Sequence, residues 1–313
     1  MAQEPRTLME AVRYFADPDV SLKHTVGLRW GGTPTCPTCG RVDVRFIPTR
    51  RLWECKEKHP RKQFSAKVGT IFEDRAIPLD KWFVAIWMVA NCKNGISSYE
   101  MARVLGITQK SAWHMNHRIR LAMKLGTIEK MGGEVEVDET YVGGKASNRH
   151  KSDPRHRHGT ADKIPVIGAL QRGGKAIAAV IERTDTRTLD SFVHAVVAPE
   201  GTLVSTDEHS GYRHLSRTYP HRVVRHTAGE YVSGPCHTNG IEAFWSLFKR
   251  AIKGTYISVE PFHGARYVDE QTFRFNERKG TDGDRFAIAL RGIIGRQLTY
   301  RELTRNGAIA SAA

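Results

Sequence analysis

Four side chains near the N-terminus have the types and spacing of a structural zinc site. The stretch CPTCG supplies Cys36 and Cys39, and WECKEKH supplies Cys55 and His59. Two short turns that each present two ligands to one tetrahedral ion give the spacing of a zinc ribbon. Thiolate and imidazole ligands suit Zn²⁺ better than Mg²⁺ or Ca²⁺. The pattern therefore predicts one structural zinc ion.

The fourth zinc ligand stays open on the sequence alone. His59 precedes Pro60 and departs from a plain second C-x2-C pair, so another histidine could replace it. The competing interpretation of the whole cluster is a set of ordinary buried thiols beside a surface histidine. Of the remaining cysteines, Cys92 falls within an apolar helical stretch and Cys236 lies far downstream. Both are interpreted as core or incidental thiols rather than as ligands.

Acidic residues recur at the ends of two predicted strands. In VEVDETYVGG, apolar and acidic residues alternate, which predicts a strand over 134–138 that ends at Asp138, with Glu139 next and a glycine turn beyond. In GTLVSTDEHSGY, an apolar strand core over 202–206 ends at Asp207. A solvated strand end explains one such acid, whereas two in one α/β domain indicate a shared site.

Paired carboxylates of this kind suit two-metal phosphoryl transfer. Hard Mg²⁺ takes carboxylate oxygens, and two ions about 3.5–4 Å apart can bind both the attacking and the leaving oxygen of a phosphodiester. A third ligand is expected, and HTNGIEAFWSLFKR offers Glu242 on a predicted helix. Its spacing places four polar side chains on one helix face: Asn239, Glu242, Ser246 and Lys249.

A local role for Glu242 competes with the metal-ligand role. The segment from Asn239 to Glu242 also fits a capping box, in which Glu242 only closes the first turn of the helix. The spacing alone does not separate the ligand from the cap.

A helix-turn-helix pattern lies between the cysteines and the acids, in GISSYEMARVLGITQKSAWHMNHRIRLAM (95–123). A capping serine precedes a short helix, Gly106 turns the chain, and Thr108 caps a second helix. Any two-helix hairpin of a bundle gives the same pattern, but a zinc ribbon and a basic chain beside it favour DNA contact. The second helix offers four candidate DNA-facing side chains: Gln109, Lys110, His114 and Arg118.

The bulk composition favours a nucleic-acid partner. The 313 residues contain 48 Lys plus Arg against 33 Asp plus Glu, a formal net charge of +15 that suits a protein which neutralises phosphates. The longest apolar run, 82–90, is far below the roughly 20 residues that cross a bilayer. The N-terminal segment has acids and no apolar signal region, so we expect a cytoplasmic, nucleoid-associated protein.

Changes of pattern along the chain predict the order of the domains. An N-terminal helical segment over 1–32 precedes the zinc ribbon at 33–70 and a helical helix-turn-helix region at 71–127. Mixed strand and helix patterns over 133–255 predict an α/β catalytic domain, and 256–313 is predicted as a helical tail.

Six stretches in this order resemble the bacterial insertion-sequence DDE transposases, in particular the ISXO-like subfamily with an N-terminal zinc ribbon. They are RWGG…CPTCG, RKQFSAKVGTIFE, VDETYVGG, STDEHSGY, HTNGIEAFWSLFKR and RYVDEQTFRFNERK, and together they span nearly the whole chain. The resemblance implies an RNase H-like catalytic fold, with a mixed sheet flanked by helices. It also implies Mg²⁺-dependent cleavage and joining of DNA at the terminal inverted repeats of the element.

Carried over residue by residue, the resemblance assigns the catalytic acids to Asp138, Asp207 and Glu242. The 34 residues between Asp207 and Glu242 match the DD-34-E pattern of such enzymes. The subfamily also includes members with Asn as the third residue, so Asn239 is expected as a near-site helper. Lys249, on the same helix face as Glu242, is expected to contact DNA.

The resemblance also organises the neighbouring segments. Strands at 134–138, about 163–171 and 174–183 are expected to form a meander, and a helix beginning near Asn239 delivers the third acid. Between the first two strands, KASNRHKSDPRHRHGTADK (145–163) is basic and rich in turn residues. It is predicted to be a mobile loop that orders on DNA, with a solvated surface loop as the alternative.

A charged series follows in the C-terminal helical region. Glu270, Arg274 and Arg278 recur at i, i+4 and i+8. By analogy with the family they support the site or touch DNA. A surface ladder of ion pairs is the competing interpretation.

The expected cofactors are two catalytic Mg²⁺ ions, for which Mn²⁺ can substitute, and one structural Zn²⁺. The expected partners are element-end and target DNA, bound by a homo-oligomer, with no membrane. A DNA-binding regulator with an inactive DDE-like domain is the alternative, although all three acids are present. A different RNase H-fold nuclease, such as a resolvase, would not need two N-terminal DNA-reading modules. A P-loop enzyme is excluded because the segment after the first strand lacks the G-x4-G-K-[ST] frame.

Overall fold

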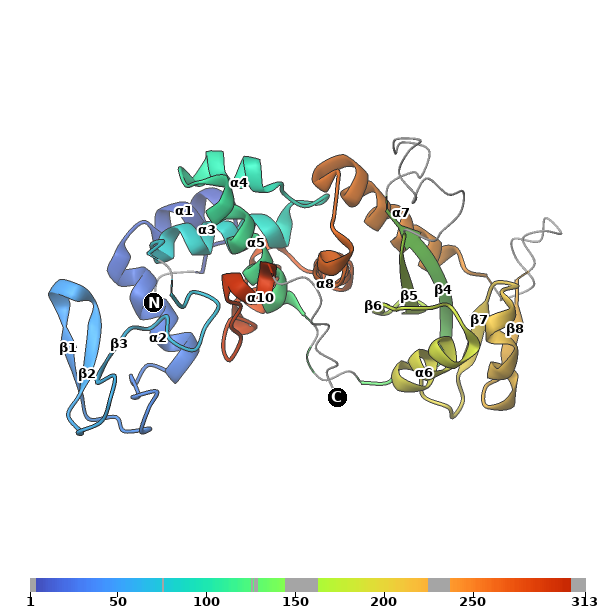
Figure 1. Ribbon diagram of the computed structural model, residues 1–313, viewed down its shortest axis with the longest axis horizontal. Helices are drawn as coiled ribbons and strands as arrows, with labels where there is room; N and C mark the ends of the chain where they lie inside the picture. The colour runs from blue at the N-terminus through green and yellow to red at the C-terminus, as the bar shows by residue number, and fades with distance from the viewer. Residues whose placement is uncertain are drawn as a thin grey trace. The chain divides into compact units, whose positions relative to one another are not determined.

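The computed structural model describes residues 4–74, 76–124, 126, 129–143, 163–224 and 237–304. These residues form two compact units, shown in Figure 1, each of which is described by itself. The first unit comprises residues up to 124 together with 279–304, and the second comprises the described residues from 126 to 278. The predicted basic loop lies outside the described residues except for Lys163, as does Cys236.

The first unit is mainly helical. Its helices are α1 (Leu8–Phe15), α2 (Pro18–Trp30), α3 (Leu79–Asn91), α4 (Ser98–Leu105), α5 (Gln109–Met123), α9 (Asp282–Arg291) and α10 (Tyr300–Thr304). Helix α3 is apolar on most of its surface and packs against α1, α5 and α9. Stacked rings of Phe15 and Phe83, 4.2 Å apart at their centroids, join α1 to α3. This aromatic packing is the centre of the unit.

Local signals in the sequence determine where several of these helices begin. Ser97 and Glu100 form a capping box at the start of α4, and the side chain of Thr108 accepts the N–H of Ser111 at the start of α5. Gly106 adopts the left-handed conformation that ends α4, at a φ of 59°. The predicted serine cap, glycine turn and Thr108 cap in 95–123 are therefore confirmed.

A small three-stranded antiparallel sheet precedes α3; Cys55 ends its second strand, and Cys36 and Cys39 lie in the turn before its first. Its strands are β1 (Val44–Ile47), β2 (Leu52–Cys55) and β3 (Gln63–Phe64), in the order β1-β2-β3, with a short 3₁₀ turn at Pro48–Arg50. Trp53 and Phe64 pair across β2 and β3, and their rings stack on each other in a cluster with Leu22 and Val26 of α2. The sheet thus has only a small apolar core of its own.

The second unit is built on a mixed five-stranded sheet. Its strands are β4 (Glu134–Val142), β5 (Ile164–Gln171), β6 (Ala176–Val180), β7 (Leu203–Thr206) and β8 (His221–Val223), in the order β6-β5-β4-β7-β8. Strands β4, β5 and β6 form an antiparallel meander, whereas β7 and β8 run parallel to β4. The predicted meander is confirmed.

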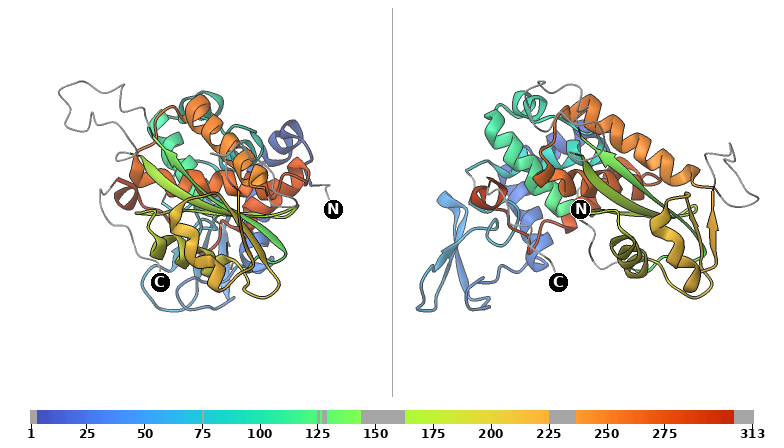
Figure 2. Two further views of the ribbon diagram at one scale, coloured as in Figure 1. Left: turned by 90° about the vertical axis from the view of Figure 1, so that its right-hand side faces the viewer. Right: turned by 45° about the vertical axis from the view of Figure 1, so that its right-hand side comes forward.

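Helices cover both faces of this sheet, as Figure 2 shows. On one face, α6 (Thr186–Val196) and the 3₁₀ segment η3 (Ser210–Arg217) bury apolar residues of β4, β5 and β7. On the other face, α7 (Asn239–Ala251) and α8 (Gly264–Asn276) pack on β5 and β6. A π-helical turn (Ile252–Tyr256) and a 3₁₀ turn (Pro261–His263) lie between these two helices in the chain.

This arrangement of a mixed sheet flanked by helices fits an RNase H-like domain, as expected. One detail of the prediction is wrong, because β4 does not end at Asp138 but continues to Val142, paired with β5 along its whole length. Asp138 is therefore the fifth residue of a nine-residue strand. Among the described residues, no helix is long and apolar enough to cross a bilayer.

Candidate active site and zinc ribbon

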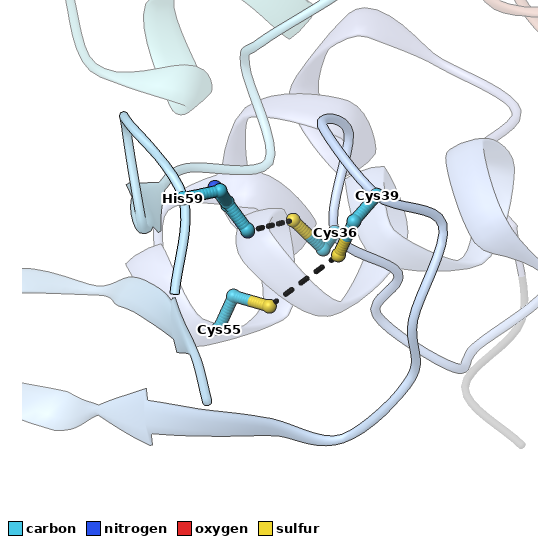
Figure 3. A group of neighbouring side chains, drawn as sticks. All are labelled: Cys36, Cys39, Cys55 and His59. Carbon is cyan, nitrogen blue, oxygen red and sulfur yellow. Dashed lines mark hydrogen bonds between the residues drawn. The ribbon is translucent and has the colours of Figure 1, made fainter. Parts of the chain in front are cut away.

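The structure brings the four predicted zinc ligands together. Cys36, Cys39, Cys55 and His59 each offer one ligand atom, and these atoms lie within 4.8 Å of one another. The Cys36 Sγ and His59 Nε2 are 3.5 Å apart, and the Cys39 and Cys55 Sγ atoms are 3.6 Å apart. Ligands about 2.3 Å from one tetrahedral zinc ion would be roughly 3.8 Å apart. The side chains converge in Figure 3, so the group fits Zn²⁺.

The imidazole of His59 is oriented for a metal. Its Nδ1 lies 2.7 Å from the carbonyl oxygen of Pro60, which can only accept a hydrogen bond. Nδ1 therefore carries the proton, and Nε2 presents its lone pair to the thiols. This contact explains why His59, despite the following proline, completes the group. Burial acts to raise the pKa of the Cys36 thiol, but backbone N–H donors from Cys39 and Thr38 outweigh it and lower that pKa to about 6.

Three carboxylates form a second group. Asp138, Glu139 and Asp207 offer oxygens that lie within 4.8 Å of one another. Asp138 and Glu139 are adjacent on β4, and Asp207 directly follows β7, which runs parallel to β4. The parallel pairing therefore brings the end of β7 to the middle of β4. Oxygen ligands in this number suit a hard divalent cation.

The electrostatics of the group are those of crowded acids. Burial is the largest influence on Asp138, and the neighbouring Asp207 and Glu139 add to it, so the pKa of Asp138 is raised to about 7. Burial also raises the pKa of Glu139, although a hydrogen bond from Tyr212 opposes the shift. Without a cation, Asp138 therefore retains its proton at a pH where an ordinary aspartate is charged.

Glu139 is a member of this group that the sequence analysis did not select. Its Oε2 accepts a 2.5 Å hydrogen bond from the hydroxyl of Tyr212, a fully buried residue of η3. His209 Nε2 lies 3.9 Å from Glu139 Oε1. The signal was present in the sequence as the adjacent pair in VDET, but a strand ending at Asp138 left Glu139 outside the expected site.

The turn after β7 fixes Asp207. Its Oδ1 accepts the backbone N–H of His209 at 3.1 Å, and the hydroxyl of Thr206 donates to the Asp207 carbonyl oxygen at 2.8 Å. His209 in turn accepts the N–H of Gly211 through Nδ1. The TDEHSG segment is thus an internally bonded turn that leads directly into η3.

Glu242 lies on α7, and its side chain is exposed. It is not one of the three acids whose oxygens lie within 4.8 Å of one another, but its charge contributes to the raised pKa of Asp138. Its Oε1 accepts a 2.8 Å hydrogen bond from the hydroxyl of Thr238. Its assignment as the third catalytic acid stays a prediction.

The rest of the predicted α7 face is also exposed, namely Asn239, Ser246 and Lys249. The helix begins at Asn239, and its N-cap is Thr238, whose side chain makes no capping hydrogen bond to the backbone. The capping box proposed from the sequence, with Asn239 as the cap and Glu242 closing it, is therefore not the structure of this helix end.

Two predicted DNA-facing residues of α5 are buried instead. His114 and Arg118 are each only 3% exposed. The Arg118 guanidinium donates to the carbonyl oxygens of Leu298, Ile71 and Glu73 at 2.8, 2.7 and 2.5 Å, and His114 Nε2 lies 3.1 Å from that of Leu298. The prediction that these two residues face DNA is wrong, because α5 packs inside the first unit and its polar side chains bind loop carbonyls.

The other two candidates on α5 remain at the surface. Lys110 is exposed, and its ammonium group lies 4.7 Å from the ring centroid of Tyr300. Gln109 is half-buried and donates to the Ser98 hydroxyl at 2.8 Å. Of the four candidates on α5, these two therefore remain accessible to solvent.

The charged series on α8 divides between the interior and the surface. Glu270 and Arg274 are 0% and 8% exposed and form an ion pair inside the second unit, where Tyr256 also donates to Glu270 at 2.5 Å. Arg278 is exposed and lies over the ring of Phe275. The interpretation of this series as a surface ladder of ion pairs is therefore wrong for Glu270 and Arg274.

Comparisons with known proteins agree with both groups of side chains. Residues 130–276 match the family model of the ISXO2-like transposase domain, and residues 19–59 match that of the transposase zinc-ribbon domain. The first range includes the acids and α7, and the second includes the four zinc ligands. The α4–α5 region lies in neither range.

A curated relative matches over most of its own length. It is an uncharacterized protein in the transposable element ISH50 of Halobacterium salinarum, and it is 26% identical over 237 residues. The alignment covers 71% of this chain and 79% of that protein.

Proposed function

Because the chain belongs to the ISXO-like insertion-sequence DDE transposases with an N-terminal zinc ribbon, we propose that it cleaves and joins DNA strands at the terminal inverted repeats of its element. The observation that carries the proposal is the group of carboxylates from β4 and from the end of β7. The proposed reaction is phosphoryl transfer assisted by two Mg²⁺ ions, with Mn²⁺ as a substitute.

The metal ligands in this proposal are Asp138, Asp207 and Glu242. When bound, a pair of divalent ions activates the attacking oxygen and neutralises charge on the phosphate. Asp138 must release the proton that its raised pKa retains before it can bind a cation. Glu139 is held by the Tyr212 hydroxyl, so we assign it to the wall of the site, where its charge adds to the attraction for cations.

DNA is held by the basic surface of the chain. Lys249 lies on the same exposed face of α7 as Glu242, and we assign it a contact with a phosphate. Asn239, one turn before Glu242 on that helix, is assigned as a polar side chain that assists beside the reacting DNA strand. The ribbon and the first turn of α5 are proposed to recognise the element end, with Lys110 as the exposed cation on α5.

The ribbon is proposed to hold one structural Zn²⁺ through Cys36, Cys39, Cys55 and His59. Its small apolar core supports this role, because a module of this size gains most of its folding free energy from the metal. The protein is further proposed to act as a homo-oligomer on DNA, in the cytoplasm.

The test is incubation of purified protein with DNA that carries the element end and its flank, in Mg²⁺, with the product ends mapped at nucleotide resolution. Wild-type protein should cut at the boundary of the inverted repeat, and Asp138→Asn should bind the same DNA without cutting it. If wild-type protein bound the element end specifically but did not cut it, the alternative function, a DNA-binding regulator with an inactive DDE-like domain, would replace the proposal. Cleavage by Asp138→Asn at the wild-type rate would show that these acids take no part in the reaction.

A further inference from the structure

Glu136 is a buried acid with no role in the proposed chemistry. It lies on β4 two residues before Asp138, so both side chains leave the same face of the strand. Its side chain is 1% exposed. Burying a carboxylate is unfavourable unless hydrogen bonds and charges compensate for its lost hydration. The contacts of Glu136 therefore indicate what it stabilises.

Those contacts are with the beginning of α7. Glu136 Oε2 accepts the backbone N–H of Ile241 at 2.9 Å, and the Glu136 carboxylate also receives a hydrogen bond from the N–H of Gly240. These are free N–H groups of the first helical turn, where the helix dipole favours a negative charge. On its other side, Glu136 Oε1 lies 3.2 Å from His237 Nδ1 and 3.5 Å from Arg172 Nε. A strand carboxylate thus caps the 13-residue helix that carries Glu242.

Two glycines allow the helix to approach this closely. A Cβ on Gly240 would lie 2.8 Å from Glu136 Oε2 and 2.6 Å from Leu170 Cδ2. A Cβ on Gly168, which pairs with Asp138 across β4 and β5, would lie 2.8 Å from the ring of Trp245 on α7. Both positions exclude larger residues because α7 packs directly on the sheet beside the acids.

We propose that Glu136 is a positioning residue that fixes the first turn of α7 against β4 and thereby sets the separation of Asp138 and Glu242 for divalent-metal binding. Glu242 directly follows Ile241, the residue whose amide Glu136 holds. The inference rests on the proposed assignment of Glu242 as a metal ligand. The hydrogen-bond acceptor, more than the charge, is the required feature, because the helix end is held through two N–H groups.

The test compares three changes in the full-length protein, with Mn²⁺ alone as the probe. Glu136→Ala removes the acceptor and should weaken Mn²⁺ binding about 10- to 100-fold, the range expected when a group that orients a metal ligand is lost. Glu136→Gln keeps an acceptor oxygen of the same reach and should stay within about threefold of wild type. Glu242→Gln gives the effect of losing the ligand itself. Mn²⁺ binding is measured by electron paramagnetic resonance titration.

Hydrogen exchange supplies a second readout that does not depend on metal. The amides of Gly240 and Ile241 should exchange faster in Glu136→Ala and keep wild-type protection in Glu136→Gln. If Glu136 did not hold the helix end, both amides would be equally protected in wild type, Glu136→Ala and Glu136→Gln. That result would overturn the inference even if the metal affinity changed.

A matched pair of glycine substitutions covers the case in which Glu136→Ala does not fold. Gly240→Ala should displace the helix end and weaken Mn²⁺ binding with Glu136 intact. Gly254→Ala adds the same methyl group in the following π-helical turn, where a Cβ meets nothing within 4 Å, and should leave binding unchanged. Equal Mn²⁺ affinities for these two variants would contradict the positioning role.

The inference and the proposed function fail in different ways. Wild-type Mn²⁺ binding by Glu242→Gln would refute Glu242 as a ligand and with it the proposed site. Defective binding by Glu242→Gln together with wild-type binding by Glu136→Ala would refute only the positioning role of Glu136. If Glu136 acts through Glu242, Glu136→Ala should add less than about threefold to the defect of Glu242→Gln. Full additivity would show that it acts elsewhere.

Discussion

The zinc ribbon and the acidic group both gather metal-ligand side chains, but they do so by different means. In the ribbon, Cys36 and Cys39 come from the turn before β1, and Cys55 and His59 come from the end of β2 and the segment that follows it. In the acidic group, Asp138 and Asp207 are far apart in the sequence and are brought together by the parallel pairing of β4 and β7. Local turns position the first group, and the register of a large sheet positions the second.

The supporting cores differ as much as the ligands. The ribbon rests on a small cluster that includes Trp53 and Phe64 and contains two of the ligand cysteines themselves. The acids lie on a sheet with an extensive apolar cluster on each face. Metal should therefore be needed to fold the ribbon, whereas the sheet should fold without metal and be strained only by the repulsion of its carboxylates.

Removal of zinc is expected to have the largest effect. Cys39→Ser should lose the metal and unfold the ribbon, because binding to structural zinc sites contributes on the order of 10 kcal/mol. Amides of β1 and β2 should lose their protection from hydrogen exchange, while those of β4 and β5 keep theirs. His59→Cys, which retains four zinc-binding side chains, is the control and should keep one zinc per chain.

Metal analysis and hydrogen exchange on the same samples decide this point. Loss of protection in β4 as well as β1 after Cys39→Ser would show that the two sites are not independently supported. Retention of stoichiometric zinc by Cys39→Ser would exclude it as a ligand.

The pH dependence of stability is expected to be the next largest effect, and it belongs to the acidic group. Folded Asp138 keeps its proton up to a pKa of about 7, against an ordinary value of 3.8. Between these values the unfolded chain binds fewer protons than the folded chain, so the free energy of unfolding falls as pH rises. One group contributes at most about 1.4 kcal/mol per pH unit. Above pH 7 this contribution no longer changes.

Denaturation of metal-free protein at pH 5 and at pH 7.5 measures the effect. Wild-type protein should be less stable at pH 7.5, Asp138→Asn should have a smaller dependence, and Mg²⁺ should restore stability at the higher pH. Equal pH dependences for the two proteins would contradict the crowding of these acids.

A surface cation should give the smallest effect. Lys110→Ala should weaken binding to element-end DNA by roughly 1 kcal/mol and reduce its salt dependence by about one ion, because one phosphate contact is lost. Lys175→Ala, at an exposed turn of the other unit, is the matched control. Unchanged binding by Lys110→Ala across a salt titration would move DNA recognition away from α5.

Much of the site could be predicted because its ligands obey local rules. The zinc ligands follow from turn spacing, and the strands that carry Asp138 and Asp207 follow from alternation and apolar runs. The end of β4 was predicted four residues too early, because pairing with β5 extends the strand through Thr140 to Val142, directly before the glycine turn. Glu139 was missed for this reason.

Side-chain burial inside the first unit was the other feature that could not be predicted from the sequence. Nothing in the sequence of α5 shows that Arg118 donates hydrogen bonds to the carbonyl groups of residues 71, 73 and 298, which are distant in the sequence. The sequence pattern of a basic side chain in a helix-turn-helix is the same whether the side chain contacts DNA or donates hydrogen bonds to a loop of the same protein. Tertiary packing alone decided between the two, as it also did for the Glu270–Arg274 pair.

We propose that Asp138, Asp207 and Glu242 act together in metal-dependent DNA cleavage, with Glu139 held beside them by Tyr212. The most direct test is the single-turnover rate of element-end cleavage in Mg²⁺ by Glu242→Gln and Glu139→Gln, measured side by side with saturating DNA. We expect a loss of about 10³-fold or more for Glu242→Gln, comparable to removal of a group that stabilises transition-state charge. For Glu139→Gln we expect less than about a tenfold loss. The reverse order would make Asp138, Glu139 and Asp207 the catalytic acids and contradict the role proposed for Glu242.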